Sequence, residues 1–426
     1  MFTRKSYIKN KFNLFVLIIM ANLITLINFL LDWPLVRLAN QRATNFVDLD
    51  LVLKSLDCAQ SSGANTSLSL LYSNCNYIYG SPLIILGQNI NFGFLSLNLL
   101  AWSFLILTNT LLAAVIFFAV KNHSHALIFV FLITSSPPIS LLFERANIDT
   151  LIFILVIFSA LLYSKNLKTL SLIFLIITTL IKFYTLPLLL LLLFVHLNKK
   201  NYILVTAVAA ITTVNVIFDL VRIQKVPASG LAQFGSAVFS WYFDQLGLHL
   251  YKGIWMIFGT LATLSTAYYL SKNPKFFTPA LLIKFEFRHT NFIDTILSWT
   301  SFIFLTCYLF GFNYDYRLIF LASGGLLVLK FHDHKKFKTW ELLLILTFWG
   351  SAGIGVTNER FIGWQQNVFV IFQLLGDLST FLWASYLLAF FFNSMKSTSG
   401  TNLFKSFLPK SVRSIKGKWT RSPLKL

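Results

Sequence analysis

The sequence predicts an all-α, polytopic integral membrane protein with about 12 transmembrane helices, and three observations support this fold class. Hydrophobic residues make up 56% of the 426 residues, the mean hydropathy is +0.71 and only 12% of the residues are charged. Soluble domains carry roughly 25% charged residues. Apolar runs near the length of about 20 residues that a helix needs to cross a bilayer recur along the chain. The third observation is the uneven distribution of the formal charge of +20.

The first expected span covers residues 12–31 and follows four basic residues. It is too long for a signal-peptide core and no small-residue cleavage site follows it, so we expect it to remain uncleaved. Several of the other runs are short for a bilayer, and 169–181 with 184–197 forms either two spans or one bent or re-entrant element. The eleven further candidates are 95–120, 126–142, 148–164, 169–181, 184–197, 202–219, 253–271, 292–312, 317–330, 340–357 and 368–393.

The charged residues predict the orientation of these spans. With a cytoplasmic N-terminus and 12 alternating spans, the cytoplasmic segments hold 25 of the 35 basic residues but only four of the 15 acidic ones. This is the positive-inside pattern, and it places both termini in the cytoplasm. The surplus positive charge then faces anionic lipid, so nucleic acid is not expected as a partner.

The chain reads as one multi-span membrane domain, residues 1–393, with outer loops at 32–82 and 220–252. A basic tail follows at 394–426, and we expect it to be disordered and cytoplasmic. No nucleotide-binding, metal-binding or serine-hydrolase motif is found, which argues against an ATP-driven pump. No metal and no cofactor are therefore expected.

The first outer loop contains a predicted helix with two acidic residues at its start. Leu49, Val52 and Leu56 recur at helical spacing, so we expect this helix to lie on the membrane with its apolar face down. Asp48 and Asp50 then face water, where an ionised carboxylate can accept a proton from a hydroxyl group. The alternative is that Asp48 only caps the helix.

Two further pairs of residues in this loop have two interpretations each. Cys58 and Cys75 either form a disulfide that fixes the loop or remain free thiols. Tyr77 and Tyr79 either anchor the chain at the membrane interface or line a binding site for sugar or lipid phosphate.

A polar turn follows the apolar run 126–142. Glu144, Arg145, Asn147 and Asp149 lie within six positions at a predicted outer membrane edge, where polar groups are costly unless they are paired. Arg145 either pairs with Glu144 and orients its neighbours, or faces a phosphate group that its guanidinium suits.

Two more basic residues are predicted at the outer headgroup level. Lys182 interrupts two apolar runs and either snorkels to the surface or binds an anionic headgroup. Arg317 either forms a local ion pair with Asp315 or binds phosphate. Together with Arg145, these cations converge on one level, which favours a site for a lipid-borne phosphate.

Four motifs in this order resemble glycosyltransferase family 87, polytopic enzymes with the C-type (GT-C) fold that are similar to bacterial polyprenyl-phosphate-mannose-dependent mannosyltransferases. The resemblance covers about residues 12–393. The chain has Ala146 where the family often has Gly, and Asp50 where a basic or aromatic residue is common. The motifs are Asp48-Leu49-Asp50, Ser136-Pro137-Pro138 with Glu144-Arg145-Ala146-Asn147-Ile148-Asp149, Ile181-Lys182-Phe183-Tyr184 and Asn313-Tyr314-Asp315-Tyr316-Arg317.

The resemblance implies a hexose transfer, with inversion, from a polyprenyl-phosphate sugar donor to a glycolipid, polysaccharide or protein acceptor. The reaction would take place on the extracytoplasmic face of a bacterial plasma membrane. By motif position, Asp48 is the expected base and Asp50 the second choice. The resemblance implies donor-phosphate contacts from Arg317, Lys182, Tyr184, Tyr316 and Arg145, with support from Glu144, Asn147, Asp149, Tyr314 and Asp315.

Two other functions remain open at this stage. A transporter or lipid flippase needs polar residues near the middle of the bilayer in matched halves of the chain, and only Asp377 clearly qualifies. An O-antigen polymerase or ligase depends on a much larger outer loop than either one here. The sequence does not assign a role to Asp377, nor does it select the sugar.

Overall fold

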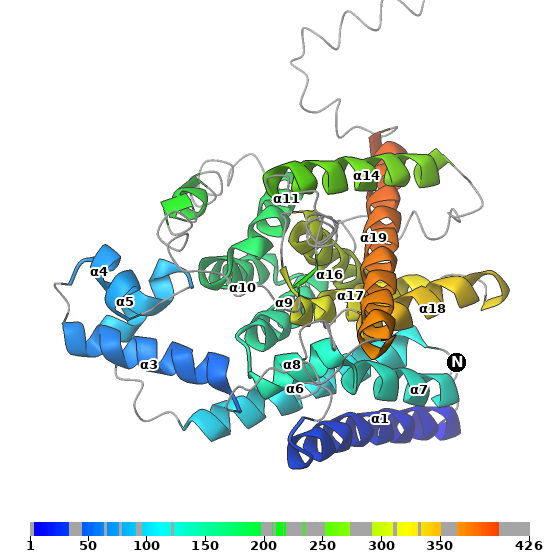
Figure 1. Ribbon diagram of the computed structural model, residues 1–426, viewed down its shortest axis with the longest axis horizontal. Coiled ribbons are helices and arrows are strands. Elements are labelled where there is room, and N and C mark those ends of the chain that lie inside the picture. The colour runs from blue at the N-terminus through cyan, green and yellow to red at the C-terminus, as the bar shows by residue number, and fades with distance from the viewer. Residues whose placement is uncertain are drawn as a thin grey trace, which may run out of the picture.

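Within the described residues, the computed structural model is helical apart from one short strand pair (Figure 1), which agrees with the predicted all-α class. β1 (Gln233–Phe234) pairs antiparallel with β2 (Asn313–Tyr314). The predicted span 202–219, the outer loop 220–252 and the tail fall mostly outside the described residues. The structure describes residues 4–33, 45–63, 66–75, 79–90, 96–120, 123–196, 207, 210–215, 217–218, 233–234, 252–272, 292–309, 313–330, 334–350 and 364–399.

Within the described residues, four helices are long and apolar enough to cross a membrane. They agree with four of the predicted spans and support a membrane protein. A fifth is added if two consecutive helices, α7 (His123–Thr134) and α8 (Pro137–Glu144), count as one span bent by 58°. Pro137 and Pro138 cause this bend, because proline cannot donate to the helix ladder. The four helices are α1 (Arg4–Leu30), α6 (Leu97–Ala119), α16 (Phe292–Leu309) and α19 (Trp364–Ser399).

The remaining helices are shorter or less apolar. The predicted break at residue 182 is confirmed, because a 3-10 turn, η1 (Phe183–Thr185), separates two helices there. In Figure 1, α14 lies across one end of α19. The helix α19 continues to Ser399, so the first residues of the predicted disordered tail are helical. These helices are α9 (Asp149–Ser164), α10 (Lys168–Ile181), α11 (Leu186–His196), α14 (Lys252–Lys272), α17 (Ile319–Lys330) and α18 (His334–Gly350).

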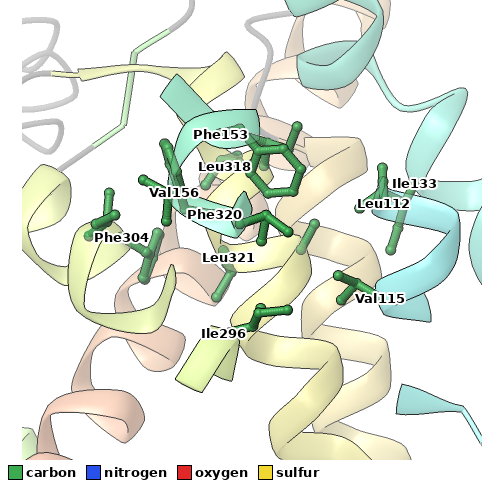
Figure 2. Packing of buried hydrophobic residues seen from close by; sticks show 14 of the residues in the cluster. Leu112, Val115, Ile133, Phe153, Val156, Ile296, Phe304, Leu318, Phe320 and Leu321 are labelled. Carbon is green, nitrogen blue, oxygen red and sulfur yellow. The ribbon is translucent and has the colours of Figure 1, made fainter. Parts of the chain in front are cut away.

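The main core lies between α6, α9, α16 and α17 (Figure 2). Phe153 of α9 meets Phe320 of α17 edge to face, with ring centroids 5.9 Å apart. A Cβ atom at Gly324 would lie 2.4 Å from the Ser301 hydroxyl oxygen and 3.1 Å from the Ser301 backbone nitrogen, so glycine favours the close approach of α17 to α16. Small residues allow the same close packing in membrane helix pairs. The core fixes the start of α9 beside the residues that precede α17.

The predicted first outer loop, 32–82, holds two short helices, and a third follows from its end to Asn89; the three pack around a second, smaller core, which we call the α3–α5 unit. It consists of α3 (Val47–Ser62), α4 (Leu68–Asn74) and α5 (Ser81–Asn89), at the left of Figure 1. The disulfide Cys58–Cys75 is present, as one of the two interpretations predicted.

The predicted orientation of α3 is wrong, because its apolar face packs on protein. Val52 and Leu56 lie in the small core, and Leu56 contacts Gly87 of α5 so closely that a Cβ atom there would lie 2.8 Å from a Leu56 methyl group. The burial comes from helix–helix packing, so α3 does not need a membrane to cover this face.

Candidate active site

Two backbone hydrogen bonds attach the start of α3 to the polar turn between α8 and α9. The Phe46 N–H donates to the Glu144 carbonyl (2.6 Å), and the Asp48 N–H donates to the Arg145 carbonyl (3.1 Å). Phe46 and Ala146 both have left-handed backbone angles, with φ of 66° and 44°. Two distant motifs therefore meet through the main chain, which places their side chains within contact distance.

Asp48 is held by this turn through both of its carboxylate oxygens. Its Oδ1 accepts hydrogen bonds from Arg145 Nε (3.0 Å) and Nη2 (2.7 Å), and its Oδ2 accepts one from the Asn147 amide. The Asp48 side chain is only 12% exposed, and it does not cap α3, whose N-cap residue is Phe46. Neither the predicted water-facing carboxylate nor the simple cap is correct.

The structure also changes the predicted partner of Arg145. We expected a local pair with Glu144, but the ion pair in the structure joins Arg145 to Asp48, 97 positions away. Glu144 is fully buried beneath the turn. Arg145 therefore links the α3–α5 unit to the turn between α8 and α9.

A second ionic cluster surrounds the fully buried carboxylate of Asp149, the first residue of α9. Lys182 Nζ lies 3.0 Å from its Oδ1, and Arg317 Nε lies 3.4 Å from its Oδ2. The Tyr184 hydroxyl also donates to Oδ1. One carboxylate and two cations give these three charged residues a formal charge of +1, which favours an added anion.

One prediction for these cations is corrected by this geometry, and one stays untested. Lys182 does not snorkel, because its side chain is only 9% exposed. Arg317 pairs with Asp149 of α9, and the side chain of Asp315, its expected local partner, lies outside the described atoms. Lys182 and Arg317 therefore both pair with Asp149, which lies far from them in the sequence.

Aromatic rings hold the two cations in place. The Lys182 ammonium lies 5.1 Å from the Tyr79 ring centroid, and the Arg317 guanidinium lies 4.9 Å from the Tyr184 ring centroid, both within cation–π range. Tyr79 is buried, which favours the site-lining interpretation over the interfacial anchor. Tyr77 lies outside the described residues.

The electrostatic surroundings keep Tyr79 in its neutral form. Burial raises the pKa of the Tyr79 hydroxyl well above its usual value, and the nearby carboxylates of Asp48 and Asp149 raise it further. Burial also lowers the pKa of Lys182, which Asp149 partly offsets. Tyr79 therefore remains a neutral hydrogen-bond donor at any pH near neutrality.

Asn147 joins the two clusters. Its Nδ2 donates to Asp48 Oδ2, while its Oδ1 accepts from Lys182 Nζ (3.3 Å) and from the Asp149 N–H (2.9 Å). One continuous network thus runs from Asp48 through Asn147 to the Asp149 cluster. It contains two carboxylates (Asp48 and Asp149) and three cations (Arg145, Lys182 and Arg317), so one positive charge is in excess. This set is able to accept a proton at the Asp48 end and bind an anion at the other end.

Of the other predicted site residues, Asp50 has its printed contact outside this network, and Tyr314, Asp315 and Tyr316 are described only in their backbone. Asp50 points away and pairs with Lys54 at 2.7 Å on the surface of α3. Tyr314 lies in β2, and Asp315 and Tyr316 lie in the 3-10 helix η3 (Asp315–Leu318). Only their backbone is described, so the predicted roles of these three side chains fall outside the described atoms.

Gly80 contributes to the site in a way that sequence reasoning missed. Its N–H donates to the Ile181 carbonyl (3.2 Å), and a Cβ atom here would lie 1.7 Å from the Leu180 carbonyl oxygen. The close approach places Tyr79 beside Lys182. The only signal in the sequence is a glycine directly after a tyrosine, which is too common to identify such a contact.

The described residues contain no group of three or more His, Cys, Asp or Glu side chains that could hold a metal ion. Comparison with models of known families, with curated proteins and with solved structures gives no match to this chain. The family resemblance of the four motifs therefore stays a prediction, and the function has to be argued from the network itself.

Proposed function

We propose that this protein is an integral membrane glycosyltransferase that moves a mannose-like hexose from a polyprenyl-phosphate carrier to an acceptor hydroxyl group, with inversion. In this proposal the chain crosses a bacterial plasma membrane about 12 times. Both termini are cytoplasmic, and the network faces the exterior. The acceptor is a glycolipid, a polysaccharide or a protein.

The observation that carries the proposal is the continuous network from Asp48 to Lys182 and Arg317. Transfer from a lipid phosphate requires a base for the acceptor and cations for the departing phosphate, close enough for one sugar to lie between them. Asn147 bonds to both Asp48 and Lys182, so the two functions are separated by a single side chain.

The reaction follows from these positions. The acceptor hydroxyl oxygen attacks the anomeric carbon of the sugar while its proton passes to Asp48. The bond between the anomeric carbon and the phosphate oxygen breaks, and polyprenyl phosphate leaves with the electron pair. Lys182 and Arg317 stabilise the negative charge on that phosphate, and the rings of Tyr79 and Tyr184 hold these two cations in place.

Asp48 retains the capacity to act as the base. A carboxylate offers about four acceptor positions, and Arg145 and Asn147 occupy three of them. The remaining position is available for an acceptor hydroxyl.

Membranes that contain the protein, supplied with a panel of polyprenyl-phosphate sugars and read by the mass of the product, test the proposal. We expect one donor to yield a glycosylated product, and Asp48→Asn to abolish it while the variant stays folded. No product with any donor, or movement of a labelled lipid without a glycosidic bond, would refute the proposal and favour a flippase.

A further inference from the structure

Asn147 occupies a position that requires both a hydrogen-bond donor and a hydrogen-bond acceptor. The side-chain amide has a donor end and an acceptor end, and the structure uses both at once. Aspartate lacks the donor, lysine lacks the acceptor, and an apolar residue lacks both. Asn147 is also 2% exposed, so water does not replace either contact freely.

The orientation of this amide is fixed by the main chain. The Asp149 N–H is part of the first turn of α9 and donates to Asn147 Oδ1 (2.9 Å), so the oxygen must face this way. The Nδ2 group then has to face Asp48. Thr150 holds the backbone of Asn147 by two further hydrogen bonds to its carbonyl oxygen, from N–H (2.9 Å) and from Oγ1 (2.8 Å).

We propose that Asn147 is a positioning residue that couples the phosphate-binding cations to the base. Its Nδ2 orients Asp48 and its Oδ1 holds Lys182, so a phosphate that contacts Lys182 alters the group that orients Asp48. This inference rests on the proposed function and adds to it a link between donor occupancy and proton transfer.

Several charged or titratable groups lie around Asp48 and Lys182, the two residues that Asn147 joins. A test of Asn147 has to separate its effect from the effects of these groups. Arg145 contacts Asp48 directly, and Tyr79 and Lys182 both interact with its charge. At the other end, Lys182 pairs with Asp149, and Asp149 also bonds to Arg317 and Tyr184. A useful variant must therefore change the amide of Asn147 and leave all of these groups in place.

Asn147→Asp meets this requirement, because it preserves the size of the side chain and the acceptor for Lys182 while it replaces the donor by a second carboxylate. Two facing carboxylates share a proton readily. We expect the acid limb of the pH profile of kcat to move to higher pH by about one unit or more. Asn109→Asp is the matched control, because Asn109 is another buried asparagine and donates to Thr25 on α1 (2.8 Å). Asn109→Asp should leave the acid limb of the pH profile of kcat unchanged.

An unshifted acid limb in folded Asn147→Asp would overturn the inference. Should that variant fail to fold, Asn147→Ser removes both contacts with a smaller side chain. Its kcat at saturating donor should fall at least tenfold, whereas a kcat within twofold of wild type overturns the inference.

A binding experiment separates this inference from the proposed function. The affinity for farnesyl monophosphate is measured for wild type, Asp48→Asn, Asn147→Ser and the double variant. We expect the two substitutions to be non-additive by threefold or more in Kd. Additive effects would overturn the coupling even if transfer occurs, and non-additive binding would support it even if no donor yields product.

Discussion

Asp48 and Asp50 lie two positions apart on the same helix, yet the structure gives them opposite surroundings. Asp50 pairs with the next-turn Lys54, and the two side chains are 31% and 72% exposed. Asp48 is 12% exposed and bonds to Arg145 and Asn147 from a distant turn. Surface pairs contribute about 0–1 kcal/mol, whereas a nearly buried carboxylate must be matched by its partners. The comparison shows that the neighbours, and not the residue type, distinguish a candidate base from a surface acid.

The largest expected effect tests this comparison directly. Asp48→Asn should lower kcat by about 10²- to 10⁴-fold, because it removes the general base. Asp50→Asn should leave kcat within about twofold. The rates are measured with the donor that wild type uses, and retention on gel filtration checks the fold. Equal losses in the two variants would show that the surroundings do not separate the two aspartates.

The next largest effect is on the donor KM and compares Lys182, in the buried network, with Lys54, on the surface of α3. Lys182→Gln should raise the donor KM by about 10- to 100-fold, because a charge-assisted contact to phosphate is lost. The control Lys54→Gln changes only an exposed pair and should leave KM unchanged. Donor titrations at fixed acceptor measure both values. A larger KM change in the Lys54 variant would move the phosphate site to the surface of α3.

The next effect concerns the stability of the α3–α5 unit, which contains the disulfide Cys58–Cys75. Replacing Cys58 and Cys75 by serine should destabilise the protein by about 3 kcal/mol, because the bond closes a loop with a sequence separation of 17. The midpoint of thermal unfolding in detergent measures this. The thermal midpoint of the double variant should not change when dithiothreitol is added, because no disulfide is left to reduce. A wild-type midpoint that dithiothreitol leaves unchanged would contradict the prediction.

Ala146 gives the smallest expected effect. It has φ of 44° in the turn that holds Asp48, a conformation that costs an L-residue roughly 1–2 kcal/mol and costs glycine none. Ala146→Gly should therefore raise the thermal midpoint by an amount worth about 1 kcal/mol. Ala113→Gly, in the interior of α6, is the opposite control and should lower it.

The sequence could predict the elements well, because local patterns determine them. The apolar runs indicated α1, α6, α16 and α19, and the 3-4 spacing indicated α3. The acidic, basic and amide residues of the network were also identified by type and motif. The membrane orientation and the number of spans stay predictions.

The pairing within the network could not be read in the same way. Arg145 has Glu144 beside it in sequence but bonds to Asp48, and Arg317 bonds to Asp149, which lies 168 positions away. Both choices depend on backbone contacts such as Phe46 to Glu144 and Gly80 to Ile181. These contacts join segments far apart in the chain, and single-sequence periodicity carries no information on them.

The close approach of Gly80 to the end of α10 has a mechanical consequence. Main-chain atoms touch there, with no side chain between them to deform, so the α3–α5 unit and the end of α10 have to move together. A tilt of α10 would carry Tyr79 and Lys182 with it and pull the α3–α5 unit against the turn before α9, to which the start of α3 is bonded. Such a tilt would strain the hydrogen-bonded network between Asp48 and Lys182.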